Sequence, residues 1–277
     1  MRAGAFFLFL TLVTFFFVLG CIESKTAEEW YEKGLVLNEM GKYEEALEAF
    51  DNAIQIDPDH LDAKAGELIS LAHLSRWNEA IYVALDGLDK IIQKYPGAQG
   101  WAMKSIFLLY SERYDEGLEA INNALQYEPE NSAFWSLKGA FLNYLGKSEE
   151  ALELHEKALQ KNPDEASSWD FYAITLNDLG RHEDALKANY KAIELHPDEE
   201  EFWVNLGYTL NKLEKNTEAK EAFEKSIQLN PKYGLGWARL GAALKQLGRD
   251  RDAEYAFSKA EDLGVWDKNS SIKRMLH

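Results

Sequence analysis

The stretch that decides the fold is residues 200–233, EEFWVNLGYTLNKLEKNTEAKEAFEKSIQLNPKY. Its tryptophan belongs to a series with an interval of 34 residues, Trp101, Trp135, Trp169, Trp203 and Trp237. Its proline belongs to a second series with the same interval, Pro129, Pro163, Pro197 and Pro231. Its alanine at position 219 belongs to a third, Ala151, Ala185, Ala219 and Ala253. Three residue types that keep one period indicate an internal repeat, which must be recognised before any other feature of the chain is interpreted.

A unit of this length with these signature residues resembles the tetratricopeptide repeat, a helix-turn-helix unit. The family pattern has a bulky residue at position 4, a small residue at 8, alanine at 20, an aromatic at 24 and proline at 32. The quoted unit matches it through Trp203, Gly207, Ala219, Phe223 and Pro231. Aligned in this way, the chain divides into seven repeats, at residues 27–60, 61–97, 98–131, 132–165, 166–199, 200–233 and 234–267.

The resemblance implies an all-α fold, a right-handed superhelical solenoid of seven repeats with a short C-terminal capping helix at 268–277. Leucine at position 11 is expected in the core of every repeat, at Leu37, Leu71, Leu108, Leu142, Leu176, Leu210 and Leu244. Glycine is expected to end the first helix in a left-handed conformation at Gly41, Gly146, Gly180 and Gly248. The small residue at position 8 lets the two helices of a repeat approach closely.

The second repeat matches the pattern least. It has Lys64 at position 4, no proline before Pro96, and a following unit that starts three residues late. We therefore expect a longer second helix over residues 78–94. One interpretation is a bend or a dedicated contact site, and the other is drift in one tolerant repeat.

The N-terminus predicts export. Residues 3–22 carry no charge, six of these twenty residues are Phe, and Arg2 precedes them, which is the layout of a signal peptide over residues 1–20. Val18-Leu19-Gly20-Cys21 resembles the bacterial lipobox, and Cys21 is the only cysteine, so Cys21 is the expected lipidation site and residues 21–26 a tether. The alternative is an uncleaved signal anchor. Either attaches the repeats to the membrane outside the cytoplasm.

Charge and motifs exclude several functions. The net charge of −17 disfavours nucleic acid as a partner. The sequence has no P-loop, no dinucleotide-binding glycine motif, no His-Glu-x-x-His pair and no cysteine cluster. We therefore expect no enzymatic activity, no cofactor and no metal site. Because the signal, repeats and cap account for the whole chain, no segment remains for a catalytic domain.

The resemblance implies that the first helices of the repeats line a concave groove that binds a partner protein or peptide. Position 12 there holds Asn143, Asn177 and Asn211 in consecutive repeats, then Lys245, and an amide ladder suits the backbone of an extended peptide. The other candidate groove residues are Tyr110, Tyr144, Tyr208, Asp170, Asp178 and Arg239. Since acids predominate at groove positions, a neutral or basic segment is the expected ligand.

The groove residues also have explanations that involve no ligand. The asparagines are equally explained as tolerable polar residues copied by duplication, and the tyrosines as residues that pack on a neighbouring helix. The protein would then act as a structural bridge between envelope components through its outer surface. An enzyme is the distant third reading.

Overall fold

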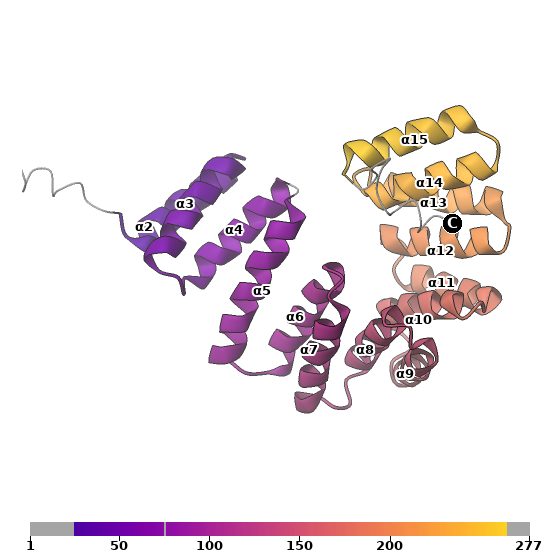
Figure 1. The fold of residues 1–277 in the computed structure, drawn as a ribbon, viewed down its shortest axis with the longest axis horizontal. Coiled ribbons are helices and arrows are strands. Elements are labelled where there is room, and N and C mark those ends of the chain that lie inside the picture. The colour runs from indigo at the N-terminus through magenta and orange to yellow at the C-terminus, as the bar shows by residue number, and fades with distance from the viewer. Residues whose placement is uncertain (1–24, 75, 265–277) are drawn as a thin grey trace, which may run out of the picture. The chain divides into compact units, whose positions relative to one another are not determined.

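The computed structural model describes residues 25–74 and 76–264, and this part of the chain is helical, with tight connections between the helices (Figure 1). The predicted signal over 1–20, Cys21 and the predicted cap over 268–277 lie outside the described residues. Within those residues, every helix is too short or too polar to cross a membrane.

The helices form pairs, as the repeat pattern predicts. The first helices of the pairs, here called A helices, are α2 (Ala27–Glu39), α4 (Leu61–His73), α6 (Ala98–Tyr110), α8 (Ser132–Tyr144), α10 (Ala166–Asp178), α12 (Glu200–Lys212) and α14 (Gly234–Gln246). The second helices, the B helices, are α3 (Tyr43–Ile56), α5 (Trp77–Lys94), α7 (Tyr114–Tyr127), α9 (Ser148–Lys161), α11 (His182–Leu195), α13 (Asn216–Leu229) and α15 (Asp250–Asp262). Each A helix begins at the residue where the sequence pattern begins a unit.

The chain divides into two compact units, which are described separately. Unit 1 ends at Pro96 and contains α2–α5, and unit 2 begins at Gly97 and contains α6–α15. In unit 1, α2 packs on α4, and in unit 2, α8, α10, α12 and α14 pack on one another in succession. The A helices α8, α10, α12 and α14 thus form one continuous surface, and this surface together with the A helix α6 is here called the A-helix face of unit 2.

In the first, fourth, sixth and seventh repeats, the glycine at position 8 lies in close contact with an aromatic ring of the same repeat. The ring of Phe50 lies against Gly34, where a Cβ atom would come within 2.4 Å of it, and Phe223 lies in the same way against Gly207, at 2.5 Å. In the fourth repeat His155 takes the place of the aromatic and lies against Gly139. The leucines of position 11 are all buried, which confirms that prediction.

The repeated tryptophans have a role beyond filling space. In the last four repeats the indole Nε1–H donates to the carbonyl of the proline six residues earlier, for Trp135 to Pro129 at 2.9 Å, Trp169 to Pro163 at 2.7 Å, Trp203 to Pro197 at 2.8 Å and Trp237 to Pro231 at 3.0 Å. Each bond ties an A helix to the end of the preceding repeat. Of these four, only Trp135 is buried; Trp169, Trp203 and Trp237 are partly buried and pack against the hydrophobic core of unit 2.

The ends of the A helices show how strictly the turn constrains the backbone. Gly41, Gly146, Gly180 and Gly248 have φ between 70° and 78°, which confirms the predicted left-handed caps. In the third and sixth repeats Glu112 and Glu214 adopt φ of 58° and 61° instead. A side chain in this conformation costs about 1 kcal/mol or more, so the repeat geometry imposes the turn even without glycine.

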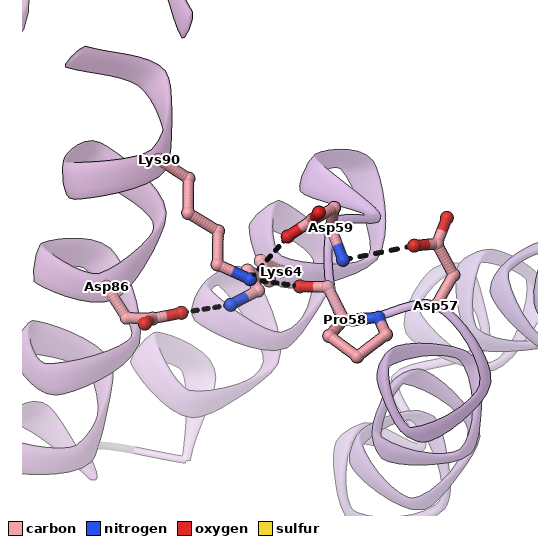
Figure 2. A network of polar contacts seen from close by, with 6 residues as sticks. All are labelled: Asp57, Pro58, Asp59, Lys64, Asp86 and Lys90. Atoms are coloured by element: carbon pink, nitrogen blue, oxygen red, sulfur yellow. Dashed lines mark hydrogen bonds and ion pairs between the residues drawn. The ribbon is translucent and has the colours of Figure 1, made fainter. Parts of the chain in front are cut away.

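The second repeat replaces the tryptophan bond with lysine contacts. Its B helix, α5, has 18 residues, which confirms the predicted extension. Figure 2 shows that Lys64, at the tryptophan position, pairs with Asp86 of α5, while Lys90 donates to the Pro58 carbonyl and pairs with Asp59 at 2.7 Å. A lysine of α5 therefore supplies the donor that Trp supplies in the last four repeats, and the Pro58 carbonyl keeps a partner.

Candidate functional site

The predicted asparagine ladder lies deeper than the sequence suggests. Asn143 is 6% exposed and its Nδ2 donates to Asp178 of the next A helix at 2.6 Å. Asn177 is also buried and its Nδ2 donates to Thr209 at 2.7 Å. The amides of Asn143 and Asn177 are therefore hydrogen-bond donors between neighbouring A helices.

The same role recurs at the equivalent position of unit 1. Asn38 donates to the Gly66 carbonyl at 3.4 Å and accepts a hydrogen bond from Ser70 at 2.8 Å, both on the next A helix. Asparagine at this position thus joins neighbouring repeats in unit 1 as well as in unit 2. The buried Oδ1 atoms of Asn143 and Asn211 have no hydrogen-bond partner among the described residues, and contact of the ladder with a ligand stays a prediction.

Asp170 is the most unusual acid on the A-helix face. It is only 4% exposed, and Asn205 of the next repeat donates to both of its carboxylate oxygens, at 2.8 and 3.0 Å. Its pKa is raised to about 8, first by burial and then by the nearby charge of Glu201, while the Asn205 hydrogen bonds act in the opposite direction. A buried carboxyl with no cationic partner is costly in its charged form.

Three tyrosines share the electrostatic environment of Asp170. The pKa values of Tyr110, Tyr144 and Tyr233 are all raised, first by desolvation, which is only partial for the exposed Tyr110, and the charges of Glu201 and Asp170 contribute to all three. The pKa of Glu201 is itself raised, mainly by burial and then by Glu199 and Glu200. We call Tyr110, Tyr144, Asp170, Glu201 and Tyr233 the acid–tyrosine cluster.

The cluster brings together side chains from the third to the sixth repeat on the A-helix face of unit 2. In their charged forms Asp170 and Glu201 oppose ionisation of the three phenols, which raises the phenol pKa values. Sequence reasoning did not select Tyr233 as a site residue. It is the last residue of its repeat and precedes α14, and nothing in the family pattern marks that position as part of a groove.

The three predicted tyrosines differ in what they contact. Tyr144 stacks on Tyr114 of the preceding B helix, with ring centroids 4.8 Å apart and an interplanar angle of 6°. The Tyr208 ring faces two cations, Lys212 at 5.3 Å and Arg239 at 5.0 Å from its centroid. Tyr110 is 68% exposed at the end of α6. Tyr110 is therefore the aromatic of this face that is most accessible to a partner.

The remaining predicted site residues lie apart from one another. Arg239 is largely covered, and burial lowers its pKa, while the Tyr208 and Tyr233 phenols raise it. Asp178 is exposed and accepts the Asn143 hydrogen bond. Lys245 is exposed near the end of α14, and among the described residues no hydrogen bond or ion pair connects it to the cluster. Of the predicted site residues, Asp170, Tyr110 and Tyr144 thus belong to the acid–tyrosine cluster, and Lys245 does not.

Comparison with known proteins identifies the repeats. Family models described as tetratricopeptide repeat match residues 27–60, 108–154, 142–200 and 200–233, which together exceed half of the 277 residues. Two of these matches coincide with predicted repeats.

Individual relatives cover smaller parts. The human mitochondrial import receptor subunit TOM70 is 25% identical over 115 residues, 40% of this chain and 19% of that protein. An uncharacterised protein of Methanocaldococcus jannaschii is 39% identical over 56 residues, 20% of this chain and 65% of that protein. The chain therefore spans about a fifth of the length of the human relative.

Solved structures agree on the fold. A tetratricopeptide repeat protein from Parabacteroides merdae is similar over 90% of this chain and 96% of that one, with a TM-score of 0.64 and 16% identity. The Cut9-Hcn1 hetero-tetramer of the APC/C is similar over 87% of this chain and 47% of that one, with a TM-score of 0.60 and 19% identity. Such repeats typically form non-enzymatic scaffolds that bind other proteins. The chain belongs to the tetratricopeptide repeat family.

Proposed function

We propose that this chain is a membrane-tethered scaffold outside the cytoplasm, which holds an extended, neutral or basic segment of a partner protein on the A-helix face of unit 2. The observation that carries the proposal is the acid–tyrosine cluster. Its two acids, Asp170 and Glu201, are partly or fully withdrawn from water and have no ion pair among the described residues.

A basic side chain of the partner would relieve this electrostatic strain. An opposite charge close to a buried carboxyl favours its ionised form, so a lysine or arginine beside Glu201 and Asp170 gains from both acids. Tyr110 offers an exposed aromatic surface at low entropic cost, since a tyrosine has few rotatable bonds. Acidic segments are disfavoured by the same charges.

The tether is the second part of the proposal. Cleavage before Cys21 and lipidation of its thiol would attach the chain by two or more acyl chains, which gives stable membrane binding. A retained anchor over residues 1–20 would have the same effect on location. In both cases the repeats face the extracytoplasmic side.

A bridge through the outer surface is the alternative, and one observation favours it. The B helices carry exposed aromatic side chains, Tyr82, Tyr190 and Tyr255. Exposed aromatics are common at protein interfaces, so a partner that binds the B helices would use them and leave the A-helix face empty.

Photo-crosslinking in the native membrane separates these functions. A photoreactive phenylalanine analogue replaces Tyr110 in one variant and Tyr190, on α11, in a matched variant. The proposal predicts one defined protein adduct from position 110 and none of that size from position 190. An adduct from position 190 alone would support the bridge and contradict binding on the A-helix face.

A further inference from the structure

Unit 1 contains a groove that the proposed function does not use. It lies between the B helices α3 and α5, over the A helix α4, and has a volume of about 550 Å³. Its apolar lining comes from the buried Leu47 and Leu71 and the partly buried Val83. The rim includes Tyr82, which is exposed.

Five acids and one arginine also line this groove, and the arginine forms ion pairs with two of the acids. Arg76 pairs with Glu79 at 2.6 Å and with Glu44 at 3.6 Å. The side-chain carboxylates of Asp51 and Glu67 have no hydrogen bond or ion pair to another described residue. The fifth acid is Glu48. The pKa of Glu67 is raised to about 7, first by burial and then by the charge of Asp51, while the charges of Lys64 and Arg76 act in the opposite direction. Burial also raises the pKa of Asp51.

A second groove at the equivalent place in unit 2 shows which features belong to the fold. It lies between the B helices α13 and α15, over α14, with a volume of about 290 Å³. There Arg249 pairs with Asp252 as Arg76 pairs with Glu79. Tyr255 lies at the rim, as Tyr82 does. A hollow between consecutive B helices is therefore a property of the repeat.

The chemistry of the two grooves differs at one repeat position. The residue that corresponds to Glu67 is Leu240, so the groove of unit 2 has an apolar floor. Trp237 lines that groove and its ring meets Tyr255 edge-on, with centroids 6.0 Å apart. In unit 1 the corresponding residue is Lys64, which pairs with Asp86 instead. The larger volume and the acidic floor are thus particular to the atypical repeat.

We infer that the groove between α3 and α5 docks a lysine or arginine side chain of a partner protein, with its methylene groups against Leu47, Leu71 and Val83 and its charged end beside Asp51 and Glu67. Long basic side chains combine an apolar stem with a charged tip, which is the combination that this groove presents. A metal ion does not fit as well, since no three metal-binding side chains of the described residues come close enough together to hold one. The groove lies between two B helices with its floor on α4, and it is a second docking surface, built from other residues than the A-helix face of unit 2.

The test uses the full chain and capped tripeptides as probes. Acetyl-Ala-Lys-Ala-amide and its norleucine analogue, which lacks the charge, are titrated while methyl NMR signals of Leu47, Leu71 and Val83 are followed. The lysine peptide is expected to shift these signals with saturation, and the norleucine peptide to do so at least about ten-fold more weakly, because the charge-assisted contact is absent.

A matched pair of variants separates docking from general attraction to an acidic protein. Glu67→Gln should lower the affinity for the lysine peptide by about ten-fold. Glu224→Gln, which removes one charge from the matched groove of unit 2, should leave the affinity at Leu47, Leu71 and Val83 unchanged. Melting curves of both variants check that they are folded.

Three results would overturn the inference: equal affinity of the lysine and norleucine peptides, an equal loss in both variants, or shifts spread over the surface without saturation at the three methyl groups. None of them bears on Tyr110 or Glu201, so the inference and the proposed function fail independently.

Discussion

Asn205 donates its side-chain amide to both carboxylate oxygens of Asp170, at 2.8 and 3.0 Å, and thereby joins α12 to α10 in the middle of the acid–tyrosine cluster. The bond orients a carboxyl that is buried and has a pKa of about 8. Near neutral pH this group therefore lies close to its titration midpoint. Its charge affects both the stability of unit 2 and the recognition of a partner.

Asp170→Asn is expected to stabilise unit 2 in mildly basic solution. The unfolded carboxyl titrates near 3.8 and the folded one near 8, so the folded state binds more protons between these values and the free energy of unfolding falls as pH rises through them. The variant should remove this loss. Its free energy of unfolding should exceed that of the wild type by about 2–5 kcal/mol at pH 8 and by less than about 1 kcal/mol at pH 4. Urea unfolding at both pH values measures it, and an equal effect at the two would contradict the assignment.

His155→Phe should make the protein more resistant to acid. His155 is fully buried against Gly139, shares a 3.2 Å hydrogen bond with Ser136, and has a pKa lowered to about 3 by burial. The unfolded histidine binds its proton near 6.5, so stability is present above that pH and is lost as pH falls toward 3.

The wild type should accordingly lose roughly 4–5 kcal/mol more than the variant between pH 7 and pH 3. Phenylalanine is the residue that Phe50 and Phe223 provide in the same place of other repeats, so the ring should be accommodated. Parallel acid unfolding curves for wild type and variant would show that His155 does not titrate in this way.

Trp135→Ala should destabilise unit 2 more than Trp169→Ala does. Both lose the indole bond to a proline carbonyl, but only Trp135 is buried, and two lysines, Lys157 and Lys161, lie over its ring at 3.8 and 4.9 Å from the centroid. The expected costs are about 3–5 kcal/mol for Trp135 and about 2–3 kcal/mol for the partly exposed Trp169. Chemical denaturation of both variants decides the order, and the reverse order would contradict it.

Cys21→Ser tests the tether. If Cys21 receives the lipid, the variant should remain an unprocessed precursor and should not incorporate a labelled fatty acid, whereas the wild type should begin at Cys21. N-terminal mass spectrometry of the membrane fraction measures both. An intact Met1–Gly20 segment on the mature wild-type protein would replace the lipoprotein by a signal anchor.

The periodic part of the fold was predictable because one residue type at a fixed position has one physical role in every repeat. Gly34, Phe50 and Leu37 make contacts that depend only on neighbours in the same repeat or the next. The long α5 helix was predictable for the related reason that a missing proline removes its stop signal. The exchange of the Trp bond for the Lys90 contact with Pro58 was not predictable, since it joins residues 32 positions apart.

The candidate site was harder to predict from the sequence than the fold was. A repeat position defines which helix a residue lies on, but not which neighbour its side chain bonds. Asn143 and Asn177 stand at groove positions yet donate to the next repeat, and Tyr144 stacks on Tyr114. Replacing the asparagines would therefore disturb folding as well as any ligand contact. Glu201 and Tyr110 are the better residues to change.

The most direct test of the account measures the affinity of the partner captured from position 110 for wild type and three variants. Glu201→Gln and Tyr110→Ala should each weaken binding by about ten-fold, and the loss from Glu201→Gln should shrink at high salt because a charge contact is screened. Glu221→Gln, on the exposed surface of α13, serves as the control with the same change in net charge and should bind as the wild type does. Unchanged affinity in Glu201→Gln and Tyr110→Ala, or an equal loss in Glu221→Gln, would contradict recognition by the acid–tyrosine cluster.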